Sequence, residues 1–215
     1  NPRKQIFKFL INTWDNLCSE NEIDYSLAYG TLLGWYRNKK IIPYDGDCDV
    51  WIDKNSIDKI IKIGDFTNNL NKNSFNYNDN NSYNYKLIIH PEHNLPMSDR
   101  KRWNIKGELV SKQVDHASFN GVFARLVGYN KYEMCHLDIF IYYKAVDNNE
   151  LNKNYSNKLL TKTNHNLYCP YISTHIGCNL FKTYYSKLEN IRVKVPDIKQ
   201  TNDILTTCYG SNFII

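Results

Sequence analysis

Four aspartates lie close together in IIPYDGDCDVWID, an otherwise apolar and aromatic segment at residues 41–53. Successive side chains of a β-strand point to opposite faces, so residues two apart share a face. In a strand over residues 47–53, Asp47 and Asp49 would therefore lie together, opposite an apolar face. Carboxylates this close repel one another unless cations offset their charge. The segment predicts a cation site on one face of a strand.

A later strand-like run, MCHLDIFIYY, carries a further acid at Asp138, on the face opposite its apolar residues. If the two strands are neighbours, Asp138 converges with Asp47 and Asp49. Oxygen ligands suit Mg²⁺ or Mn²⁺, which bind a few carboxylates together with substrate phosphates. Two such ions would contact the attacking and the leaving oxygen of a phosphoryl transfer. We predict these three aspartates as metal ligands and catalytic residues.

The other two aspartates of the segment have structural explanations. Asp45 would shape the turn after Pro43, and Asp53 would cap a helix that begins near Ser56. An EF-hand loop begins with a similar spacing of acids, but Val50 takes the position that requires Gly and Ser56 the position that requires Glu. Calcium is therefore rejected.

The segment YGTLLG supplies a candidate anion site. Gly30 would lie at a strand-to-helix junction, where the missing side chain lets backbone N–H groups approach a ligand. A helix that starts near Thr31 would direct its positive end at the same place, and Arg37 would add a guanidinium suited to phosphate oxygens. An ordinary tight turn with a surface arginine looks the same, but the position shortly before Asp47 favours phosphate binding. Arg125, in an expected hairpin, is a further candidate for contact with a donor phosphate, because a buried arginine usually has a partner.

Apolar periodicity and turn residues predict a mixed order of elements. Helices are expected in residues 2–24, 31–38, 56–63, 179–188 and 201–210. Strands are expected in residues 25–30, 47–53, 86–90 and 191–196, and a hairpin in residues 121–143. The fold class is therefore α/β (α+β), with a small mixed sheet flanked by helices. We expect one domain over residues 1–215 with a loop or insertion at about 65–119, which begins where the composition turns to Asn, Ser, Tyr and Lys.

Composition limits the partners and the compartment. A 42% apolar share supports a core, and the absence of a long apolar run predicts no membrane span in this segment. The net charge is +5, but the basic run at residues 98–106 is typical of a solvated loop, and no nucleic-acid motif accompanies it. No nucleic-acid partner is therefore expected. The six cysteines occur singly, as reduced buried thiols do, which favours the cytoplasm; the Golgi lumen is the alternative if an anchor precedes residue 1.

A second candidate metal site lies in HNLYCPYISTHIGC, which brings four side chains within fourteen residues: His165, Cys169, His175 and Cys178. Cysteine and histidine are the ligands of structural zinc. The spacing fits no standard zinc motif, however, and both residue types also occur in ordinary cores. Zinc is therefore not the favoured cofactor.

The segment AYGTLLGWYRNKKIIPYDGDCDVWI resembles the signature of the LicD/fukutin family, within the nucleotidyltransferase fold. That signature is Tyr-Gly-Thr-Leu-Leu-Gly, an Arg a few residues on, then Ile-Pro-Trp-Asp-x-Asp-x-Asp and a hydrophobic residue. HLDIF is similar to the family's later strand with the third acid, and IRVKVP followed by ILTTCYGSNF is similar to its closing pattern. Tyr44 and Gly46 depart from the pattern, where Trp and a polar residue are usual, and residues 65–119 match no feature of it.

The resemblance implies a metal-dependent phosphotransferase with a CDP-linked donor and a carbohydrate acceptor. Such an enzyme moves a phosphoalcohol, such as phosphocholine or ribitol phosphate, onto a glycan hydroxyl. Asp138 would also help to deprotonate that hydroxyl. By position, the metal-binding acids would be Asp47, Asp49 and Asp138, and the donor phosphates would contact Gly30, Thr31 and Arg37. Two alternatives stay open: a nucleotidyltransferase that moves a nucleoside monophosphate from a triphosphate, and a non-catalytic glycan-binding domain.

Overall fold

The computed structural model describes eight stretches of the chain: residues 2–71, 83–104, 108–111, 118–130, 133–144, 167–169, 174–175 and 182–213. Their α-helices are α1 (Pro2–Glu20), α2 (Tyr29–Asn38), α3 (Ile57–Asn71) and α5 (Ile198–Tyr209), with short 3-10 helices at Lys54–Ser56 and Met97–Asp99. Their strands are β1 (Tyr25–Leu27), β2 (Cys48–Asp53), β3 (Asn84–Ile89), β4 (Ala124–Tyr129), β5 (Met134–Lys144), β6 (Leu167–Cys169), β7 (Thr174–His175), β8 (Thr183–Leu188) and β9 (Ile191–Pro196). No helix in these stretches is both long enough and apolar enough to cross a bilayer.

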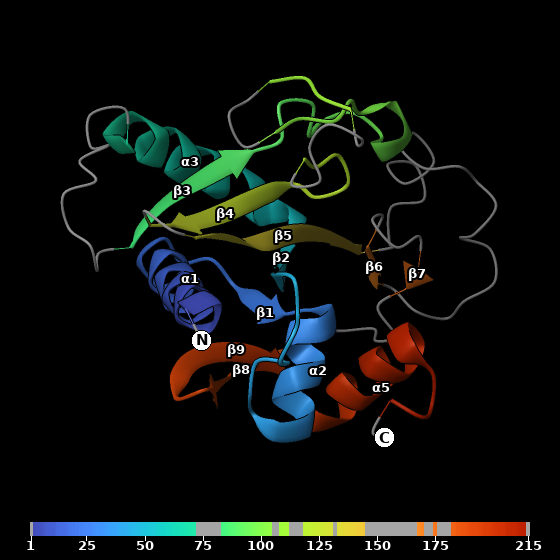
Figure 1. The fold of residues 1–215 in the computed structure, drawn as a ribbon. Helices are drawn as coiled ribbons and strands as arrows, with labels where there is room; N and C mark the ends of the chain where they lie inside the picture. Colours follow the sequence, from blue (N-terminus) through green and yellow to red (C-terminus); the bar gives the residue numbers. More distant parts are fainter. Residues whose placement is uncertain are drawn as a thin grey trace.

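A mixed sheet with strand order β1-β2-β5-β4-β3 runs through the middle of the fold (Figure 1). Strands β2 and β5 are parallel, whereas β1 with β2, β4 with β5 and β3 with β4 are antiparallel. Strand β6 pairs with the end of β5, and β7 pairs with β6. Helices and a mixed sheet confirm the α+β class. The direct pairing of β2 with β5 confirms that the two acid-bearing strands are neighbours.

Helices α1 and α3 pack on the same face of the sheet. A Cβ added at Gly128 would lie 2.8 Å from Leu10 of α1, and one added at Gly64 of α3 would lie 3.0 Å from Ile89. Gly128 and Ile89 share this face, because Ile89 pairs with Ala124, four residues before Gly128 on β4. The opposite face is therefore the one that can carry polar groups.

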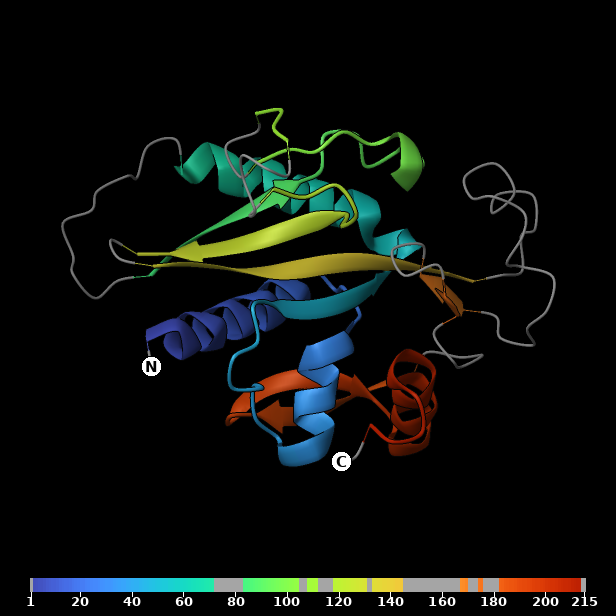
Figure 2. The same cartoon turned by 45° about the vertical axis from the view of Figure 1, so that its right-hand side comes forward.

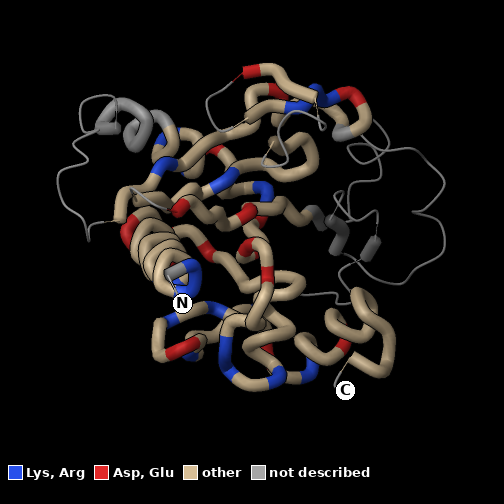
Figure 3. The backbone as a smooth tube through the Cα atoms, in the orientation of Figure 1, with Lys and Arg blue, Asp and Glu red and all other residues tan. Residues whose placement is uncertain are grey.

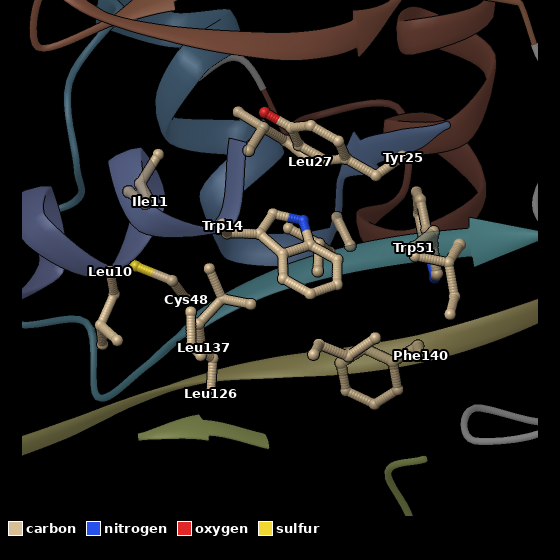
Figure 4. Close-up of a cluster of buried hydrophobic side chains, with 14 of the residues drawn as sticks. Leu10, Ile11, Trp14, Tyr25, Leu27, Cys48, Trp51, Leu126, Leu137 and Phe140 are labelled. Atoms are coloured by element: carbon tan, nitrogen blue, oxygen red, sulfur yellow. The ribbon is translucent and has the colours of Figure 1, made fainter. Parts of the chain in front are cut away.

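The apolar side of α1 is fully buried, which confirms the helix expected near the N-terminus. Trp14 is 1% exposed and lies at the centre of a cluster contributed by α1 and strands β1, β2, β4 and β5 (Figure 4). Its ring meets that of Tyr25 edge to face, with centroids 6.0 Å apart. Truncating a buried tryptophan to alanine typically costs about 3–5 kcal/mol. This cluster fixes β2 and β5 side by side beneath the acids.

The helix expected in residues 179–188 is wrong where the structure describes the chain. Strands β8 and β9 form an antiparallel hairpin beside α2 and α5 (Figure 2). The two-residue turn consists of Glu189 and Asn190, which both have positive φ, 52° and 70°. Such turns match the twist of paired strands, and Asn adopts this region more readily than most residues. Tyr184 and Tyr185 are exposed, so they do not form the buried apolar face on which the expected helix depended.

Two boundaries also differ from expectation. Strand β1 ends at Leu27 and α2 begins at Tyr29, so Gly30 lies inside the first turn of the helix rather than at the end of a strand. Helix α3 continues to Asn71, and β3 follows it, so the stretch at about 65–119 contains regular structure. No proline interrupts α3, and Asn and Thr extend a helix at a small cost per residue.

Candidate active site

The parallel pairing of β2 and β5 brings two acids into register. Asp49 lies directly opposite Asp138, and both are buried, at 9% and 5% exposure. Asp47 immediately precedes β2 and has the same facing as Asp49. Figure 3 shows acidic positions gathered at the centre of the molecule, with basic positions beside them. The structure therefore brings together the three aspartates predicted from the sequence.

His136 completes the cluster. Its Nε2 lies 3.9 Å from Oδ2 of Asp47 and 3.9 Å from Oδ1 of Asp138. One donor atom from each of these three residues lies within 4.8 Å of the others, close enough for one cation to contact all of them. His136 shares its strand face with Asp138 by alternation, but no role was predicted for it. The signal that could have found it is its position two residues before an acid.

Arg125 lies next to the cluster and is paired with one of its acids. Nε of Arg125 donates to Oδ1 of Asp138 at 2.5 Å, and Nη2 donates to Oδ2 at 3.0 Å. The two residues face each other across the antiparallel pair of β4 and β5. The guanidinium also lies over the ring of Phe119, 5.0 Å from its centroid. A bidentate pair of this kind fixes the orientation of the Asp138 carboxylate.

The acids perturb one another. Burial raises the pKa of Asp47 to about 6, and the negative charges of Asp138 and Asp45 add to the rise. Burial, followed by the charges of Asp47 and Asp138, raises the pKa of Asp49 well above its usual range. Such shifts mean that the ionised cluster is unfavourable as it stands. A divalent cation would remove that cost, so the donor set fits the Mg²⁺ or Mn²⁺ that the family resemblance implies.

Helix α2 is anchored on the same face of the sheet by its first residue. The ring of Tyr29 meets Trp51 and Phe140 edge to face, with centroids 4.8 and 5.0 Å apart. Trp51 and Phe140 are in register on β2 and β5, two residues beyond the paired acids. These aromatic contacts hold the N-terminus of α2 over the acidic cluster.

The two predicted phosphate-binding residues at the start of α2 have partners within the chain. The buried hydroxyl oxygen of Thr31 accepts a hydrogen bond from the backbone N–H of Asp49 at 2.9 Å. A Cβ at Gly30 would lie only 2.7 Å from Oδ2 of Asp45. A carboxylate of the chain itself therefore lies against the helix N-terminus, as expected of an anion there. Gly30 is needed for this close approach.

The remaining predicted cation of the site, Arg37, lies at the last turn of α2. Its Nε and Nη2 both donate to the backbone carbonyl of Phe213, with Nε at 2.9 Å. The contact ties α2 to the end of the described chain. These bonds hold the guanidinium at the C-terminal end of α2, whereas Gly30 and Thr31 lie in the first turn of the helix.

Asp45 and Asp53 behave as their structural explanations predict. Oδ1 of Asp45 accepts from the N–H of Gly46 at 3.0 Å, within a turn closed by the N–H of Asp45 and the carbonyl of Ile42. Oδ1 of Asp53 accepts from the N–H of Asn55 at 2.8 Å and caps the helical turn after β2. Within the acidic segment, Asp45 and Asp53 therefore stabilise local turns, whereas Asp47 and Asp49 lie at the candidate metal site.

The proposed zinc ligands mostly lie outside the described residues. His165 and Cys178 fall outside them, and of Cys169 and His175 only the backbone, in β6 and β7, is described. The zinc prediction stays a prediction.

Part of the chain is similar to a known protein family. Residues 22–106 match the family model described as LicD/FKTN/FKRP, nucleotidyltransferase domain. The chain is also similar to the lipopolysaccharide cholinephosphotransferase LicD of Haemophilus influenzae, with 33% identity over 54 residues. That match covers 25% of this chain and 20% of the relative, so the chain spans only a fifth of the relative's length. Both findings confirm the resemblance predicted from the motifs.

Proposed function

Residues 22–106 match the LicD/FKTN/FKRP family model, and on that basis we propose that the chain is a transferase of phosphoalcohols. The donor is a CDP-linked alcohol, with CDP-choline first among those to test because the similar bacterial protein is a cholinephosphotransferase. The acceptor is a hydroxyl group of a glycan. The observation that carries the proposal is that Asp47 and Asp138 lie with His136 in one cluster of ligand atoms, with Asp49 in register with Asp138 on the neighbouring parallel strand.

The reaction is a displacement at phosphorus. The acceptor oxygen forms a bond to the phosphorus that carries the alcohol, and the bond from that phosphorus to the oxygen of CMP breaks. The hydroxyl proton passes to a base, and CMP leaves with the bonding electrons. Both oxygens of Asp138 already accept hydrogen bonds from Arg125, so Asp138 is poorly suited to take this proton.

We assign the holding of one or two divalent cations to Asp47, Asp49 and Asp138. Bound there, Mg²⁺ or Mn²⁺ would neutralise the charge that develops on the phosphoryl oxygens. The chain's own residues orient this site. Arg125 holds the Asp138 carboxylate, and Thr31, in the first turn of α2, holds the backbone of Asp49.

The experiment is a product assay. The protein is incubated with Mg²⁺ or Mn²⁺, CDP-choline or CDP-ribitol, and a panel of oligosaccharides, and both CMP and pyrophosphate are measured. Nucleoside triphosphates are included in parallel. Metal-dependent CMP release with acceptor modification is expected. Pyrophosphate release from a triphosphate would overturn the proposal in favour of a nucleotidyltransferase, and no turnover with any donor would favour a glycan-binding domain.

A matched pair of variants tests the site within that assay. Asp47→Asn should reduce CMP release by at least about a hundredfold, because it removes a charged ligand of the proposed cation. Asp53→Asn lies in the same acidic segment but only caps a helical turn, and asparagine caps as well as aspartate. Asp53→Asn should therefore retain native activity. Equal losses in both variants would mean that the effect comes from the fold rather than from the chemistry.

A further inference from the structure

We infer that His136 is a direct nitrogen ligand of the bound cation and that the site for this reason prefers Mn²⁺ over Mg²⁺. This inference rests on the proposed function only in assuming that the cluster binds a divalent cation. The inference adds a histidine to the proposed aspartate ligands. It also distinguishes Mn²⁺ from Mg²⁺, which the aspartates alone do not.

The geometry of His136 carries the inference. The imidazole Nε2 is equally far, 3.9 Å, from one oxygen of Asp47 and one of Asp138, and all three atoms lie within 4.8 Å of one another. The side chain of His136 is 23% exposed, so the ring is partly enclosed yet still reachable from solvent. A cation that contacted both carboxylates would therefore also be within reach of the ring nitrogen after small side-chain movements.

The pairing of Asp138 increases the share of His136 in binding. Arg125 donates to both oxygens of Asp138, so this carboxylate is already partly neutralised and is a weaker cation ligand than an unpaired one. Arg125 also adds a positive charge close to the cluster. The imidazole nitrogen, a strong ligand without a charge of its own, compensates for part of that loss.

The choice of metal follows from ligand chemistry. Mg²⁺ strongly prefers an octahedron of oxygens and keeps much of its water, whereas imidazole is a good ligand for first-row transition metals. Mn²⁺ accepts the same carboxylates as Mg²⁺ and tolerates a nitrogen among them. A cluster with two or three carboxylates and one imidazole therefore favours Mn²⁺ over Mg²⁺.

Pulsed electron paramagnetic resonance of Mn²⁺ tests the inference without any substrate. Full-length protein with less than one equivalent of Mn²⁺ should show modulation from a directly bound ¹⁴N nucleus. His136→Gln should lose the ¹⁴N modulation and bind Mn²⁺ about tenfold or more weakly, while its affinity for Mg²⁺ changes by less than about threefold. His93→Gln is the matched control, since the ring of His93 meets that of Phe123 edge to face and His93 is not part of the cluster of ligand atoms, and it should keep the signal.

The outcomes are separable from those of the product assay. Absence of ¹⁴N modulation in the native protein would overturn the inference, and so would its persistence in His136→Gln. Either result would mean that His136 is not a ligand of the bound cation. Because the native spectrum needs no variant, this test stands even if His136→Gln fails to fold. CMP release without ¹⁴N modulation would leave the proposed function intact, whereas modulation without CMP release would leave only the ligand assignment standing.

Discussion

Arg125 and Asp138 face each other across β4 and β5, and the guanidinium donates to both carboxylate oxygens, at 2.5 and 3.0 Å. Both residues are buried, at 7% and 5% exposure. Removing one member of a buried ion pair leaves an uncompensated charge, which is more costly than replacing both members. The pair therefore couples the stability of the sheet to the geometry of the candidate metal site.

Arg125→Met should reduce the free energy of unfolding by about 3–5 kcal/mol, because Asp138 would keep its buried charge without the guanidinium. The double variant Arg125→Met, Asp138→Leu should recover most of that loss. Urea unfolding in the presence of a chelator measures both values without help from a bound cation. A double variant no more stable than Arg125→Met alone would contradict the coupling.

Asp49→Asn should make the metal-free protein more stable while abolishing transfer. The pKa of Asp49 is raised by burial and by the charges of Asp47 and Asp138, so its ionised form destabilises the folded state at neutral pH. Asparagine has a similar shape and no charge. Thermal unfolding at pH 7.5 with a chelator should show a midpoint a few degrees higher than that of the native protein.

The same comparison with Mn²⁺ provides the control. A cation that binds only the folded state raises the unfolding midpoint of the native protein by mass action. The unfolding midpoint of Asp49→Asn should rise much less with added Mn²⁺. The difference between the midpoints of the variant and the native protein should therefore become smaller or change sign. A variant that is less stable under both conditions would show that Asp49 has a structural role instead.

Which side chains share a face within each acid-bearing strand was predictable, because this depends on a local rule. Alternation along a strand fixes which side chains share a face, and it sets Asp47 with Asp49 and His136 with Asp138 from sequence alone. The hairpin of β4 and β5 and the helix α1 were predictable for the same reason, since their patterns are continuous. What alternation does not give is the pairing of strands distant in sequence, such as β2 with β5.

The features that were not predicted depend on such distant contacts. Arg125 was expected to contact a donor phosphate, but only the β4–β5 register reveals that it faces Asp138. Asp45 was assigned to its own turn, and only the packing of that turn against α2 brings its carboxylate to Gly30. The hairpin of β8 and β9 was missed because its turn, Glu189–Asn190, contains neither Gly nor Pro.

Gly34→Ala should destabilise the fold although alanine is the better helix former. A Cβ at Gly34 would lie 2.5 Å from the backbone carbonyl oxygen of Lys40, where the chain turns back against α2. A backbone atom cannot move aside as a flexible side chain can, so a loss of about 1–3 kcal/mol is expected. Gly46→Ala is the control, since nothing lies within 4 Å of its added Cβ, and should change stability by less than about 0.5 kcal/mol. Equal stability of the two variants in urea unfolding would refute the steric account.

His90 should make the fold sensitive to acid. It is fully buried, Nδ1 accepts the N–H of Glu92 at 3.1 Å, and Nε2 lies 3.2 Å from the carbonyl of Lys101, so the neutral ring fits this site. Burial, with the nearby charge of Arg100, lowers the pKa of His90 from 6.5 to about 4. Protonation would also remove the acceptor that the N–H of Glu92 uses.

The direction of the effect follows from proton binding. Between pH 6.5 and 4 the unfolded chain binds a proton at His90 while the folded chain does not, so stability is lost as the pH falls through this window. The loss from this residue should reach about 2–3 kcal/mol near pH 4. His90→Gln removes the titrating group, so its deficit relative to the native protein should be largest at pH 7 and shrink by that amount at pH 4. Urea unfolding at a series of pH values measures the difference, in which groups common to both proteins cancel. Parallel stability curves for the two proteins would show that His90 titrates alike in both states.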